Sequence, residues 1–187
     1  MTIGTMDIYL LVIIVSCLVV GFFWGAARSL MLLGAWLLAF ISGAYLKLEL
    51  GSYLASRWTN YSPAFADMAA FGIIYVGILL MAPILIVAST NGDQRVSRIQ
   101  ALDDVIGAFF FMLVAILGIA GLIIVLSLFY GTDGAAVTSL GGPDWTANLY
   151  RSLIDSTIGG FIDEQIVPLL GTLLGPILPP DVREVMG

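Results

Sequence analysis

Thirty-nine residues separate Asp7 from Lys47, and Arg28 is the only charged residue among them. A straight α-helix of that length would reach about 58 Å, roughly twice the hydrocarbon thickness of a bilayer. The segment is therefore too apolar for the surface of a soluble domain and too long for a single membrane crossing. We expect the chain to turn back near Arg28, in the sequence WGAARS, because glycine and small alanines permit a sharp turn.

Further apolar segments of similar length follow this one. Of the 187 residues, 60% are hydrophobic and 11% are charged, which lies well outside the range of soluble domains. A helix needs about 18 to 20 apolar residues to cross a bilayer. We predict an all-α membrane protein with four transmembrane helices, of which the first two form a tight hairpin. The predicted spans cover about residues 8–26, 29–46, 67–90 and 105–130.

The end of the chain differs in charge from the rest. Residues 131–187 carry seven acidic residues and two arginines, whereas residues 1–130 are almost neutral. Apolar residues at helical spacing predict an amphipathic helix over about 145–162, and the prolines that follow argue against a fifth regular span. We therefore expect a four-helix transmembrane domain, residues 1–130, and an extramembrane, acidic, Gly/Pro-rich tail, residues 131–187.

Charged residues at the predicted membrane boundaries allow two interpretations each. Arg28 is interpreted as an interfacial anchor at the turn, and the alternative is a functional ion recessed into a polar cavity. Asp103 and Asp104 open the fourth span, where carboxylates can cap free amides and complement the helix dipole. A metal site or proton relay is the alternative for this pair. A recessed Arg28 would be expected to pair with one of these two aspartates.

Small residues recur at a spacing of four in the first two spans. They are Gly21 and Gly25 in the first, and Ala35, Ala39 and Gly43 in the second. Such spacing creates a smooth face against which another helix can approach closely. We favour packing between these two spans, and dimerisation is the alternative.

Several classes of chemistry lack their residues in this sequence. The chain has no histidine and one cysteine, which excludes the usual Ser/His and Cys/His nucleophilic pairs and histidine-based zinc motifs. No basic stripe is present to bind nucleic acid. The single lysine, Lys47, is interpreted as an interfacial anchor. We predict no catalytic residue, cofactor or metal site, and no enzymatic activity.

The order of several residues resembles the colicin V production (CvpA) family of bacterial inner-membrane proteins. An aspartate opens the first span in MDIYLLVIIV, an arginine follows Gly-x-x-x-Gly in GFFWGAARSL, and Asp-x-x-x-Gly opens the fourth span in DDVIGAFFFMLVAILG. The resemblance covers roughly residues 6–130. The positions that carry it are Asp7, Gly21, Gly25, Arg28, Asp103, Asp104 and Gly107.

This resemblance implies a multi-pass protein of the bacterial inner membrane, with a role in toxin production or envelope maintenance. We expect a non-catalytic accessory or scaffold subunit of a larger membrane assembly. A small channel or transporter-like factor formed by oligomerisation is the alternative, although residues 68–92 and 105–130 contain no charge that could line a path. The expected partners are the lipid bilayer, other membrane subunits and, in a homo-oligomer, further copies of the chain.

Overall fold

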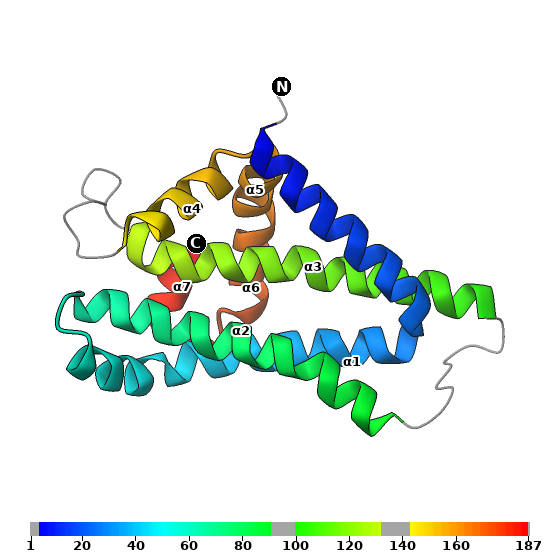
Figure 1. Ribbon diagram of the computed structural model, residues 1–187, viewed down its shortest axis with the longest axis horizontal. Coiled ribbons are helices and arrows are strands. Elements are labelled where there is room, and N and C mark those ends of the chain that lie inside the picture. The colour runs from blue at the N-terminus through cyan, green and yellow to red at the C-terminus, as the bar shows by residue number, and fades with distance from the viewer. Residues whose placement is uncertain (1–3, 91–99, 132–142, 187) are drawn as a thin grey trace.

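The computed structural model describes residues 4–90, 100–131 and 143–186, which form helices and turns without a strand. Part of the predicted tail, residues 132–142, lies outside these ranges. The three long helices are α1 (Thr5–Arg57), α2 (Pro63–Ser89) and α3 (Gln100–Tyr130), shown in Figure 1. Shorter elements follow: α4 (Asp144–Ile154), α5 (Thr157–Phe161), the π-helical turn η1 (Ile162–Ile166), α6 (Val167–Leu174) and α7 (Pro180–Met186).

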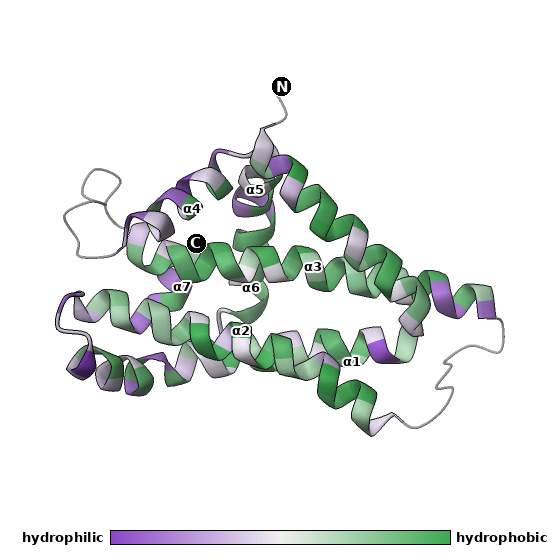
Figure 2. Ribbon diagram, viewed as in Figure 1, coloured by the Kyte–Doolittle hydropathy of each residue, from purple (hydrophilic) through white to green (hydrophobic). Residues whose placement is uncertain are grey.

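The three long helices are the candidate membrane spans of the chain. Each is long and apolar enough to cross a membrane. Figure 2 shows hydrophobic residues along most of their length and hydrophilic residues toward their ends and on the tail helices. The predicted all-α class is therefore confirmed for the described residues, with three helices that could span a membrane where the sequence predicted four.

Helix α1 is broken at Gly25. The helix runs over 53 residues, but Gly25 has a φ of 76° and a ψ of 171°. Glycine adopts a positive φ readily because it has no Cβ. We call residues 5–24 the first arm, residues 26–57 the second arm, and the break between them the elbow. The break lies within the stretch where the sequence predicted a turn, but the arms diverge as an open V with α3 between them (Figure 1).

The core lies where the second arm, α2 and α3 meet. Trp36 and Phe40 of the second arm stack with their ring centroids 5.6 Å apart, and Phe71 and Tyr75 of α2 pack against Phe40. The indole N–H of Trp36 donates to the Tyr75 hydroxyl at 2.8 Å, and that hydroxyl donates to the Gly118 carbonyl of α3 at 3.1 Å. The buried polar atoms of these aromatic residues therefore have partners inside the bundle.

The tail packs into the same core. Leu153, Ile162 and Val182 are almost fully buried and belong to the cluster that contains Trp36. The predicted helix over 145–162 is interrupted after Ile154, because the Ser156 hydroxyl accepts from the Gly159 amide at 2.9 Å and so caps a new helix. The tail therefore covers the bundle as several short helices, where the sequence predicted one amphipathic helix.

The small residues of the second arm face α2. A Cβ on Gly43 would lie 2.4 Å from Cδ2 of Phe71, Ala39 is fully buried, and Ala35 packs in a cluster with Ala82 of α2. The structure thus places this face against α2, whereas the sequence favoured packing against the first arm. The reason is the width of the V, which leaves room for other helices between its arms.

Candidate functional site

The first arm crosses the start of α3 at a contact between backbones. A Cβ on Gly21 would lie 2.6 Å from the Gly107 carbonyl oxygen, and a Cβ on Gly107 would lie 2.6 Å from the Gly21 carbonyl oxygen. Side chains larger than hydrogen do not fit at such distances. Both glycines are therefore required for the two helices to cross at this depth.

Asp103 of α3 caps the second arm. Its side chain is buried, with 2% of its surface exposed, and its Oδ2 accepts from the Ala26 amide at 3.3 Å. Ala26 begins the second arm, where the first amides have no intrahelical acceptor. A Cβ on Gly25 would lie 2.5 Å from the same carboxylate oxygen. The sequence predicted that Asp103 caps its own helix, but the structure brings its carboxylate to the elbow of α1.

Arg28 joins the elbow to the end of α2. Its Nε donates to the Thr90 hydroxyl at 3.2 Å, and that hydroxyl donates to the Ile86 carbonyl at 2.7 Å. Arg28 is half-buried, as is Asp104, which follows Asp103 on α3. The two arms of α1, the end of α2 and the start of α3 therefore meet at the elbow.

Asp7 lies at the opposite end of the first arm and joins it to the tail. Its Oδ2 accepts from the Gly4 amide at 2.9 Å, and its Oδ1 accepts from the Ile158 amide at 2.9 Å. One carboxylate therefore serves the starts of both α1 and α5.

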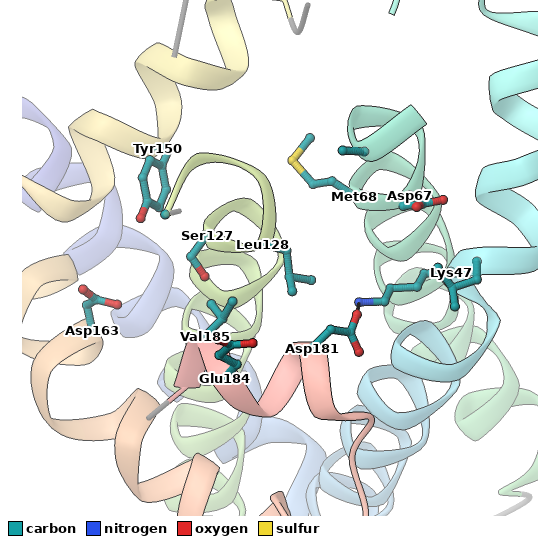
Figure 3. A pocket seen from close by; sticks show the side chains of 13 residues that line it. Lys47, Asp67, Met68, Ser127, Leu128, Tyr150, Asp163, Asp181, Glu184 and Val185 are labelled. Carbon is teal, nitrogen blue, oxygen red and sulfur yellow. Dashed lines mark hydrogen bonds and ion pairs between the residues drawn. The ribbon is translucent and has the colours of Figure 1, made fainter. Parts of the chain in front are cut away.

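An acidic cavity of about 550 Å³ lies between the second arm, α2, α3 and the tail (Figure 3). Four acidic residues line it, together with the lysine that the sequence interpreted as an interfacial anchor. Lys47 is buried, forms an ion pair with Asp181 of α7, and has its Nζ 6.0 Å from the centroid of the Phe71 ring. The acidic residues that line the cavity are Asp67, Asp163, Asp181 and Glu184.

On the tail side of this cavity, the ionised forms of acidic groups are disfavoured. Burial raises the pKa of Asp163 above its usual value, and the neighbouring Glu164 raises it further. Burial also raises the pKa of Tyr150, and Asp163 adds to that shift. Among the described residues, no group of three His, Cys, Asp or Glu side chains is arranged to hold a metal ion. Within this cavity, the ion pair between Lys47 and Asp181 joins α7 to the second arm.

We predict that Asp103→Ala destabilises the folded chain by about 1–2 kcal/mol, the usual cost of losing a helix N-cap. The midpoint of thermal unfolding in detergent measures the change. Asp104→Ala is the matched control, because it removes the same group one residue further along α3. Equal losses from the two variants would show that Asp103 has no special role at the elbow.

The family described as colicin V production protein matches residues 6–146, whereas no curated protein and no solved structure matches the chain. The matched range covers the three long helices from residue 6 onward, and it includes the elbow, Asp7 and Asp103. It also contains every position on which the sequence resemblance was based. This match covers about three quarters of the chain, so the chain belongs to the colicin V production protein family.

Proposed function

We propose that this chain is a four-pass protein of the bacterial inner membrane that serves as a non-catalytic accessory or scaffold subunit of a larger membrane assembly. The family points to toxin production or envelope maintenance as the process. The observation that supports the proposal is that the family-pattern residues make contacts that hold the helices of the chain together. Gly21 and Gly107 allow the helices to cross, Asp103 and Asp7 cap helices that begin elsewhere in the chain, and Arg28 bonds Thr90.

The spacing of charged and polar residues supports four crossings. On the second arm, Arg28 and Lys47 lie 19 residues apart, about 28 Å along a helix. Asp67 of α2 and Thr90, which follows the last residue of α2, lie 23 residues apart, about 34 Å along a helix. The first arm, residues 5–24, is about 30 Å long, close to the thickness of the hydrocarbon core. Counting the arms of α1 separately therefore gives four segments long enough to cross.

The interior of the bundle favours a scaffold over a channel within one chain. Between the elbow and the acidic cavity, the core is filled by Trp36, Phe40, Tyr75 and the aliphatic side chains of α3. The Trp36 and Tyr75 polar atoms are bonded to each other and to α3. A channel would therefore need a path between several copies of the chain.

Reconstitution of the purified chain into liposomes tests this proposal. We expect no flux of ions or small solutes above that of empty vesicles, and a native particle in mild detergent that is larger than one chain in its micelle. Flux from the chain alone would favour the channel. A monomer that restores the cellular activity without other subunits would contradict the scaffold.

The orientation follows from the basic residues. Within about 20 residues of the span ends, Arg28, Arg95 and Arg98 lie on the elbow side of a four-span chain, against Lys47 and Arg57 on the side of the termini. Arg151 and Arg183 of the tail lie further from the spans, and residues 95 and 98 lie outside the described ranges. Basic loops favour the cytoplasm. We predict extracytoplasmic termini, so that alkaline phosphatase fused to the C-terminus is active and a fluorescent protein fused there is dark. The opposite pattern would reverse the orientation.

A further inference from the structure

One segment of the tail contains no charged residue. It covers residues 166–178, IVPLLGTLLGPIL, in which Thr172 is the one polar side chain. We call these residues the crossbar, because this part of the tail runs across α3 from the first arm toward the second (Figure 1). Charged residues lie beyond both of its ends, with Asp163 and Glu164 before it and Asp181 after it.

The inner and outer faces of the crossbar are both apolar. The inner face belongs to the buried cluster that contains Trp36. On the outer face, 54% of Leu169, 64% of Leu173 and 52% of Ile177 remain exposed. A helix that is apolar on all sides is typical of a protein interior or a membrane. The buried residues of the inner face are Val167, Leu170 and Leu178.

Two polar groups at exposed residues of the crossbar are bonded within the chain. The Thr172 hydroxyl donates to the Leu169 carbonyl at 2.7 Å. The Ile177 carbonyl accepts from the Tyr45 hydroxyl of the second arm at 2.5 Å. At a surface in contact with water such groups need no partner in the protein, because water bonds them. In hydrocarbon, each polar group has to find its partner within the protein.

The contacts of the crossbar with the second arm indicate its depth, given the proposal that this arm crosses the bilayer. Ile177 bonds Tyr45, which lies two residues inside the end of the apolar stretch at Lys47. The ion pair of Lys47 with Asp181 then lies at the membrane boundary. Leu38, seven residues before Tyr45 on the same helix face, is exposed as well. The outer face of the crossbar therefore continues the apolar surface that the second arm presents to lipid.

We propose that the crossbar is immersed in the membrane, with the side chains of Leu169, Leu173 and Ile177 among the lipid acyl chains. A protein partner would also cover these side chains, but protein interfaces carry about one hydrogen bond per 100–200 Å². The polar groups of Thr172 and Ile177 already have their partners within the chain. Thirteen residues are too few to cross a bilayer, so the crossbar enters and leaves the membrane on the side of the termini.

Spin labelling of the full chain in nanodiscs tests this proposal. In a Cys17→Ala background, a nitroxide is attached through Leu173→Cys on the crossbar. Leu38→Cys is the lipid-facing control on the second arm, and Glu164→Cys is the control at an exposed charged position of the tail. The measurement is the ratio of nitroxide collisions with O₂, which concentrates in hydrocarbon, to collisions with a water-soluble nickel chelate. We expect this ratio to be severalfold higher for Leu173→Cys and Leu38→Cys than for Glu164→Cys.

The controls separate this proposal from the crossing of the second arm. A ratio for Leu173→Cys as low as that for Glu164→Cys would put the crossbar in water and overturn the proposal. Few collisions with either reagent would show that protein covers the crossbar, which overturns it too. A low ratio for Leu38→Cys would instead overturn the crossing of the second arm, and the proposal with it. Leu169→Cys, one turn earlier on the outer face, repeats the measurement if Leu173→Cys does not give folded protein.

Discussion

Replacing Gly107 by alanine is expected to destabilise the folded chain by about 3 kcal/mol or more, at the upper end of the cost of overpacking. The added Cβ would lie 2.6 Å from both the Gly21 carbonyl oxygen and the Gly25 carbonyl carbon. These are backbone atoms at the elbow, so they cannot move aside as the end of a flexible side chain can. The first arm and α3 would have to separate.

Gly118→Ala is the control for this prediction. Gly118 lies on the same helix, and a Cβ there meets no atom within 4 Å. The two variants carry the same gain in helix propensity. The thermal stability of each variant is measured as the fraction of protein that stays monodisperse after heating in detergent. Similar melting behaviour of Gly107→Ala and Gly118→Ala would mean that the backbone crossing is not tight.

The second large effect is expected for Asp181→Asn, which leaves the Lys47 ammonium buried without its ion-pair partner. Only 5% of the Lys47 side-chain surface is exposed, against 53% for Asp181. Breaking a buried pair costs about 3–5 kcal/mol, and we expect a loss of about 3 kcal/mol because Asp181 itself is half-exposed. Asp67 lines the same cavity and interacts electrostatically with Lys47, so some attraction for the lysine remains.

A double-mutant cycle separates the pair from the rest of the cavity. Lys47→Met combined with Asp181→Asn removes both charges and should recover most of the lost stability, since an apolar side chain suits the buried position. Glu184→Gln is the control, because it removes another acid of α7 that lines the cavity. Limited proteolysis of the tail reports the release of α7. The prediction fails if Glu184→Gln exposes the tail as much as Asp181→Asn does.

The sequence predicted the parts of the fold that depend on local pattern. Long apolar segments identify the candidate membrane helices. The 39 residues between Asp7 and Lys47, with a single charge, are too long for one straight crossing of a bilayer. Gly25 could be located because positive φ values are readily adopted by glycine. The family pattern could be recognised because it depends on the order of residues and not on their contacts.

The contacts could not be predicted because their partners are far apart in the sequence. Lys47 and Asp181 are separated by 134 residues, and Ala26 and Asp103 by 77. Nothing in the neighbourhood of Lys47 indicates that a proline-rich tail returns to cover it. The packing of Gly43 on α2 was missed for the same reason. Small residues mark a face for close approach, but they do not identify the helix that approaches.

The hydrogen bond from the Ile158 amide to Asp7 has a consequence for biosynthesis. The two residues are separated by 151 positions, and a ribosome adds about 5–20 residues per second. Asp7 must therefore wait about 8–30 s for its partner while all the membrane helices emerge. During that time the Asp7 end of the first arm lacks its hydrogen bond to α5. A short helix that is made after all three long helices therefore completes the start of the first one.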